Sequence, residues 1–101
     1  MSAPVNGFVL GKFMPPHTGH MYLCDFAAGL CDQLTILVCS LEREPIPGKL
    51  RHEWMSALYT NARVLHYDRD VPQEPSEHPH FWDIWRELIR SVHPEPIHRV
   101  F

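Results

Sequence analysis

The sequence predicts an α/β fold, a Rossmann-like doubly wound parallel sheet of about four strands. Two observations support this. Short apolar runs of strand length alternate with longer segments in which apolar residues recur at helical spacing. The order is strand, helix, strand, helix, strand, helix, strand, and strands that alternate with helices are joined in parallel by right-handed crossovers. With 101 residues, the chain has room for one domain.

The first strand is expected over Val5 to Leu10 and ends at Gly11. A helix follows from about Gly19 to Leu30, and Thr18 is its expected N-cap. The apolar residues of this helix have the i, i+3, i+4, i+7 spacing of a helix packed on a sheet: Leu23, Phe26, Ala27 and Leu30.

The middle of the chain contains the second strand, the second helix and a third strand. Residues Leu34 to Cys39 form a continuous apolar run, as in a central parallel strand covered on both faces. A charged, proline-containing loop from Leu41 to Lys49 leads into a helix from near Gly48 to about Tyr59. A short strand is expected from Arg63 to Tyr67.

The last third of the chain begins with a polar loop from Asp68 to His80, whose length is typical of a substrate-facing segment. The clearest helical stripe spans Phe81 to Val92 and places Trp85 on the apolar face, so we expect this side chain in the core. A fourth strand is expected from Ile97 to Phe101. An apolar strand at this place implies either an exposed sheet edge or a neighbouring strand beyond it.

Composition excludes several classes of function. The formal charge of −3 offers no broad basic surface, so we expect no nucleic-acid partner. No apolar run approaches the ~18–20 residues of a membrane span, so we expect no membrane association and a cytoplasmic protein. The three cysteines are expected to be reduced thiols, because they lack C-x-x-C spacing: Cys24, Cys31 and Cys39. Six histidines are expected to be solvated or locally hydrogen-bonded, without a metal site: His52, His66, His78, His80, His93 and His98.

The segment Gly11 to His20 lies where the first strand ends and the first helix begins. A helix N-terminus has unpaired N–H groups and a partial positive charge, so it favours an anion. His17 and His20 are spaced to reach one phosphate there. Gly19 permits close approach of a ligand to the backbone, and Lys12 adds a positive charge.

These groups suit an in-line displacement at phosphorus, which depends on positioning and charge stabilisation. A single histidine at a helix start is more often a local hydrogen-bond partner. The complete pattern G-K-F-x-P-P-H-x-G-H between a strand and a helix favours a phosphate site instead. A P-loop is excluded, because Gly7 to Lys12 is one residue too short and Phe13 replaces the required Ser or Thr.

This pattern resembles the signature of the H-x-G-H nucleotidyltransferase superfamily. Its G-K-F form is similar to the adenylyltransferase domain of the bacterial bifunctional nicotinamide mononucleotide adenylyltransferase/ribosylnicotinamide kinases. Segments 45–51 (P-I-P-G-K-L-R) and 80–85 (H-F-W-D-I-W) are similar to the same subfamily. The resemblance implies a parallel α/β fold of the nucleotidyltransferase type. It also implies transfer of AMP from ATP to nicotinamide mononucleotide (NMN), with Mg²⁺ on the phosphates, to give NAD and pyrophosphate.

The resemblance also implies roles for particular residues. The histidines of the motif, His17 and His20, are expected to bind the ATP phosphates and stabilise the transition state, with Lys12 nearby. Six further residues are expected to contact the nucleotide: Gly11, Phe13, Thr18, Gly19, Arg43 and Arg51. For Arg51, a solvated helix cation is an equal alternative.

Trp82 lies off the apolar stripe of its helix and is the candidate to stack on a nicotinamide or adenine ring. The family continues past the fourth strand to a Ser-x-Thr-x-x-Arg-like triphosphate motif, which residues 1–101 do not contain. The resemblance therefore implies an incomplete domain whose C-terminal part is missing. A transferase for pantetheine phosphate, flavin mononucleotide or a cytidylyl acceptor stays open, as do a nucleotide-binding module without turnover and a homo-oligomer.

Overall fold

The computed structural model describes residues 4–101 and contains one parallel sheet. Its four strands are β1 (Asn6–Gly11), β2 (Gln33–Cys39), β3 (Arg63–Tyr67) and β4 (Arg99–Val100), arranged in the order β3-β2-β1-β4. Each neighbouring pair is parallel. The strand order reverses at β1, because β2 and β3 lie on one side of it and β4 on the other.

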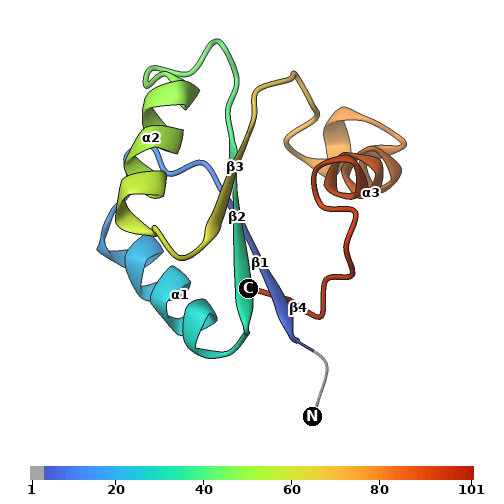
Figure 1. Ribbon diagram of the computed structural model, residues 1–101. Coiled ribbons are helices and arrows are strands. Elements are labelled where there is room, and N and C mark those ends of the chain that lie inside the picture. The colour runs from blue at the N-terminus through green and yellow to red at the C-terminus, as the bar shows by residue number, and fades with distance from the viewer. Residues whose placement is uncertain (1–3) are drawn as a thin grey trace.

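Helices cover both faces of the sheet. α1 (Thr18–Gly29) and α2 (Gly48–Leu58) pack on one face, and α3 (Phe81–Val92) packs on the other (Figure 1). A short 3₁₀ turn (Pro75–Glu77) interrupts the connection between β3 and α3. The predicted doubly wound α/β fold is confirmed. Within residues 4–101, no helix has both the length and the apolar character needed to cross a membrane.

β2 lies at the centre of the sheet, and its residues from Leu34 to Cys39 are buried, as its apolar run predicts. Successive side chains of a strand point to opposite faces, so β2 contributes to two cores. The core under α1 and α2 includes Ile36, Val38 and Met55. The core under α3 includes Leu37 and Leu88.

α1 packs through a different face from the one its apolar spacing predicts. Cys24 and Ala27 are its buried residues, whereas Leu23, Phe26 and Leu30 are exposed. The small side chains of Cys24 and Ala27 allow the helix to lie close to the sheet. The predicted stripe is therefore wrong except at Ala27.

The fourth strand is shorter than the predicted segment Ile97–Phe101. It pairs with β1 only at Arg99 and Val100. Ile97 instead packs against the core under α3, so the chain approaches the sheet across that core before it joins β1.

A substitution at Gly48 tests the packing at the start of α2. A Cβ at this glycine would lie 2.1 Å from the Ser40 hydroxyl oxygen and 2.5 Å from His66 Nε2. We expect Gly48→Ala to lower the free energy of unfolding by about 1–3 kcal/mol, because overpacking outweighs the gain in helix propensity. Gly29→Ala is the matched control, since a Cβ there meets nothing within 4 Å. Urea unfolding measures both, and an equal response of the two variants would contradict this packing.

Candidate functional site

His17 caps the N-terminus of α1. Its Nδ1 accepts hydrogen bonds from the backbone N–H groups of Gly19 (3.0 Å) and His20 (3.3 Å). Thr18, the predicted cap, is the first residue of the helix instead. The prediction followed the usual preference for threonine at a cap. In this chain, the imidazole one residue earlier reaches the same donors.

His20 completes a reciprocal cap. Its Nδ1 accepts a hydrogen bond from the backbone N–H of His17 at 3.2 Å. The two imidazole rings stack with their centroids 3.7 Å apart and an interplanar angle of 20°. The structure therefore brings the two predicted phosphate-binding histidines together.

These hydrogen bonds assign the tautomer of both rings. A neutral imidazole has one N–H donor and one acceptor nitrogen, and in each ring Nδ1 is the acceptor. The proton is therefore on Nε2 of both His17 and His20. The two stacked rings thus each carry an Nε2–H donor at a helix N-terminus, which itself favours an anion.

Phe13 packs against His20, one of the two stacked histidines. Its side chain is buried, its φ is 51°, and its ring meets His20 edge-on at a centroid distance of 4.8 Å. Gly11 is needed for this arrangement, because a Cβ would lie 2.9 Å from the Phe13 ring. A side chain at Gly19 would also be too close to its surroundings, because an added Cβ would lie 2.9 Å from His17 Cε1. The buried ring of Phe13 has a packing role, and the nucleotide contact predicted for this residue stays a prediction.

The pKa of His20 makes stability depend on pH. Burial, and then the neighbouring His17, lower this pKa from its ordinary value of 6.5. The neutral form is thus favoured by folding, so its stabilising effect is present above pH 6.5 and is lost as the pH falls through the lowered folded-state value. We expect the free energy of unfolding to drop between about pH 7.5 and 5.5, and to drop less in His20→Gln, because the Gln side chain does not titrate. Gln also preserves the capping box, so the start of the helix stays intact.

Urea titrations at the two pH values measure this difference. His80→Gln removes an exposed histidine and is the matched control. An identical pH response in wild type and His20→Gln would contradict the assignment.

Lys12 and Arg51 meet at one carboxylate. The Lys12 ammonium pairs with Oε2 of Glu44, and Arg51 Nη2 donates to Oε1 of Glu44 at 2.9 Å. Arg51 is completely buried and also donates to the backbone carbonyls of Ile46 and Lys12. The alternative of a solvated helix cation is therefore wrong for Arg51, whereas its phosphate contact stays a prediction. The spacing on α2 did not reveal that this residue points inward.

Sequence reasoning missed Glu44. It lies in the loop between β2 and α2, where an acidic side chain is ordinarily solvated. Its side chain is only 9% exposed. Pro45 and Pro47 interrupt the segment between Glu44 and Arg51, so the sequence gives no periodic signal there. Only the folded structure identifies Glu44 as the partner of Lys12.

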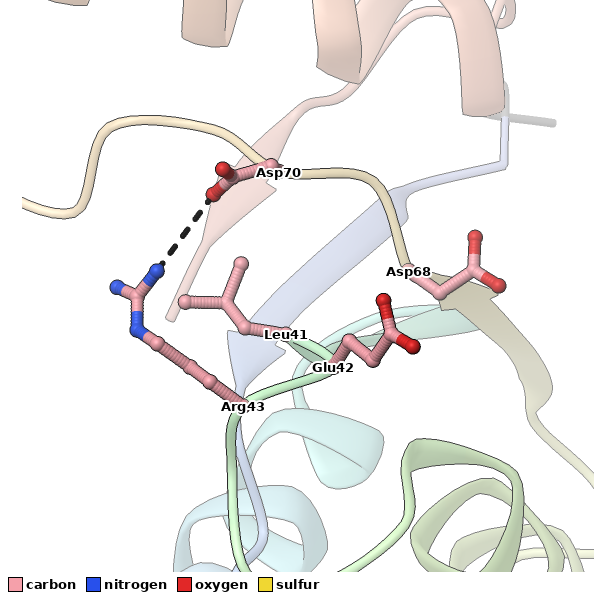
Figure 2. A pocket seen from close by; sticks show the side chains of 5 residues that line it. All are labelled: Leu41, Glu42, Arg43, Asp68 and Asp70. Carbon is pink, nitrogen blue, oxygen red and sulfur yellow. Dashed lines mark ion pairs between the residues drawn. The ribbon is translucent and has the colours of Figure 1, made fainter.

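The loops that follow β2 and β3 leave the sheet at the same end of the strands (Figure 1). Residues of these two loops line a pocket. It has a volume of about 370 Å³, and Figure 2 shows its lining residues: Leu41, Glu42, Arg43, Asp68 and Asp70. Arg43 Nη1 is 3.8 Å from Asp70 Oδ1, and both side chains are largely exposed. This exposed pair leaves the Arg43 guanidinium accessible to a ligand.

The two tryptophans of α3 occupy different environments. Trp85 packs against the core under α3 and its indole N–H donates to the Pro72 carbonyl at 2.9 Å, so its predicted core role is confirmed. Trp82 is 69% exposed and meets Phe81 edge-on. Its stacking on a ligand ring stays a prediction.

The remaining histidines and cysteines show no metal centre. Within the described part of the chain, no group of three or more His, Cys, Asp or Glu side chains is placed to hold a metal ion. His66 shares a hydrogen bond of 2.6 Å with Ser40, and His93 is buried beside the Glu95 carbonyl. The cysteines are free thiols, as predicted.

No protein-family model matches the chain. Among curated proteins, it is 30% identical over 103 residues to NadR of Escherichia coli, described as a trifunctional NAD biosynthesis/regulator protein. The match covers 88% of the chain and 25% of NadR. NadR of Salmonella typhimurium is 29% identical over the same share of each chain. The chain thus spans about a quarter of the length of these curated relatives.

Solved structures show the same fold. A NadR structure in complex with NAD and AMP-PNP matches 95% of the chain and 29% of that protein, with a TM-score of 0.72 and 22% identity. A bifunctional NMN adenylyltransferase/ADP ribose pyrophosphatase of Francisella tularensis, complexed with AMP and a manganese ion, matches 97% of the chain and 31% of that protein, with a TM-score of 0.63 and 16% identity. These similarities confirm the resemblance that the motif indicated.

Proposed function

We propose that this chain carries a nucleotidyltransferase site that transfers AMP from ATP to NMN, giving NAD and pyrophosphate. The observation that carries the proposal is the stacked pair of His17 and His20 at the N-terminus of α1, in which Nδ1 of each ring accepts a backbone hydrogen bond and Nε2–H is left as the donor. The similarity to NadR supports NAD biosynthesis as the context. The solved complexes of similar proteins with NAD, AMP-PNP and AMP support a nucleotide ligand.

The geometry explains how such a reaction proceeds without a carboxylate base. An oxygen of the NMN phosphate is already anionic, so it attacks the α-phosphorus of ATP without losing a proton. The new bond joins this oxygen to the α-phosphorus. The bond from the α-phosphorus to its bridging oxygen breaks, and pyrophosphate leaves with that electron pair. Hydrogen bonds from His17 and His20 to the phosphoryl oxygens then stabilise the charge of the transition state.

Magnesium enters this proposal as part of the substrate, MgATP. Mg²⁺ commonly retains several waters and is bound through substrate phosphates with few protein ligands. The donor set agrees with this, because residues 4–101 contain no cluster of three acidic, histidine or cysteine side chains placed around one point. Lys12, which is partly exposed, adds positive charge near the same end of β1.

The pocket at the ends of β2 and β3 is the proposed place of the acceptor nucleotide. Arg43 offers an accessible guanidinium for the phosphate of the acceptor nucleotide. On binding, this phosphate would replace the Asp70 carboxylate as the partner of Arg43. Trp82 is proposed to stack on the nicotinamide ring, because its indole is exposed.

The test is direct. The chain is incubated with ATP, Mg²⁺ and one acceptor at a time: NMN, pantetheine phosphate or flavin mononucleotide. Products are identified by mass, and pyrophosphate is measured in parallel. NAD and pyrophosphate from NMN alone are the expected result. A product formed from one of the other acceptors would show that NMN is not the acceptor of this site. A rise in melting temperature with ATP but no pyrophosphate would indicate binding without turnover.

A further inference from the structure

Glu44 contacts three donors at once. Its Oε1 accepts hydrogen bonds from the backbone N–H of Leu41 (2.7 Å) and from Arg51 Nη2 (2.9 Å). Its Oε2 pairs with the Lys12 ammonium. Burial raises the pKa of this carboxyl, but the hydrogen bonds from Lys12, Leu41 and Arg51 outweigh burial and lower it to about 2. Glu44 is therefore ionised at neutral pH.

Arg51 holds the other end of the same lysine. Its Nη1 donates to the backbone carbonyl of Lys12 at 2.9 Å, while its Nη2 holds Glu44. The main chain and the ammonium of Lys12 are thus both fixed by one connected network. Arg51 belongs to α2, Glu44 to the preceding loop and Lys12 to the segment directly after β1.

The charges of this network leave a positive charge at its exposed end. Two cations share one carboxylate, so the sum is +1 at neutral pH. Arg51 is completely buried and Glu44 nearly so, whereas 39% of the Lys12 side chain is exposed. An arriving anion can therefore reach only the ammonium.

We infer that Glu44 is a positioning residue that holds the Lys12 ammonium in place for the phosphates of the nucleotide. Glu44 acts through Lys12 and does not itself touch the substrate. A free lysine side chain has four rotatable bonds, and fixing its ammonium in advance removes an ordering cost from the bound state. The catalytic effect of this placement rests on the proposed function, whereas the placement itself does not.

The chain offers a clean measurement of the placement, because it contains only two lysines, Lys12 and Lys49. Limited acylation with a succinimidyl ester, followed by peptide mass mapping, reports how reactive each amine is. Lys49 is exposed and is the internal reference. We expect the reactivity of Lys12 relative to Lys49 to rise about threefold or more in Glu44→Gln, as when an ion pair of ordinary strength is removed.

Two further variants keep this measurement decisive. Glu53→Gln removes an exposed carboxylate of α2 and is the matched control, which we expect to leave Lys12 unchanged. Glu44→Asp retains the negative charge but moves it away from the Lys12 ammonium, so we expect it also to raise the reactivity of Lys12. This variant serves as the test if Glu44→Gln does not fold. Unchanged reactivity of Lys12 in the folded Glu44 variants would overturn the inference.

Turnover separates this inference from the proposed function. We expect Glu44→Gln to lower kcat about tenfold. When Lys12→Ala is already present, adding Glu44→Gln should change kcat by no more than about twofold, because Glu44 acts only through Lys12. Equal effects in both backgrounds would show a merely structural role. If the wild-type chain forms no NAD, the proposed function fails, and the acylation experiment still decides the placement of Lys12.

Discussion

His17→Asn is expected to lower the rate of NAD formation by about 10²-fold or more while the melting temperature stays close to that of the wild type. Asparagine is among the best N-cap residues, and its side-chain oxygen can accept the N–H groups of Gly19 and His20 that His17 Nδ1 accepts now. The substitution removes the Nε2–H donor and keeps the cap. Initial rates with ATP, Mg²⁺ and NMN, together with a thermal melt, measure the two effects separately.

His17→Ala is the matched comparison. It removes both the donor and the cap, so we expect the same loss of rate and an additional loss of about 1 kcal/mol in the free energy of unfolding. Wild-type turnover in His17→Asn would contradict a role of His17 on the phosphates. A large loss of stability in the same variant would contradict the description of His17 as a cap that asparagine can replace.

Arg51→Met is expected to destabilise the fold by about 3–5 kcal/mol. The substitution leaves the Glu44 carboxylate, whose side chain is 9% exposed, without its buried partner. It also removes the donors to the carbonyls of Ile46 and Lys12. A domain of this size is stable by only about 5–15 kcal/mol, so this loss is a large share of the total.

Urea unfolding followed by circular dichroism measures the change. Arg90→Met is the control, because Arg90 lies on α3 with 70% of its side chain exposed, and we expect a change within about 0.5 kcal/mol. A loss below about 1 kcal/mol in Arg51→Met would mean that the buried network contributes little to the fold.

The elements with a strong local signal are the ones that the sequence predicted best. The helix predicted over Phe81 to Val92 has those bounds in the structure, and Trp85 lies in the core as its stripe indicates. The strand from Arg63 to Tyr67 also has the predicted bounds. For α3, the period of the apolar residues agrees with the face that packs on the core.

Where two local choices compete, the sequence alone was insufficient. Thr18 is the expected cap of α1, but the loop conformation places the preceding residue, His17, at the cap position. On α1, the apolar spacing predicted a buried face that includes Leu23 and Phe26, but Cys24 and Ala27 face the sheet. How closely a helix approaches a strand depends also on the residues of the strand. The apolar spacing within the helix carries no information about them.

The sequence by itself determined the parallel α/β fold and the placement of His17 and His20 at a strand–helix junction. These depend on periodicity and on spacing within one short segment. Only the tertiary structure decided which nitrogen of each imidazole donates, that Phe13 and Arg51 are buried, and that Glu44 is the partner of Lys12. The burial of Phe13 and Arg51 and the pairing of Glu44 depend on contacts between residues up to 39 positions apart, which no local pattern encodes. The donor nitrogen of each imidazole depends on the conformation of the loop before α1.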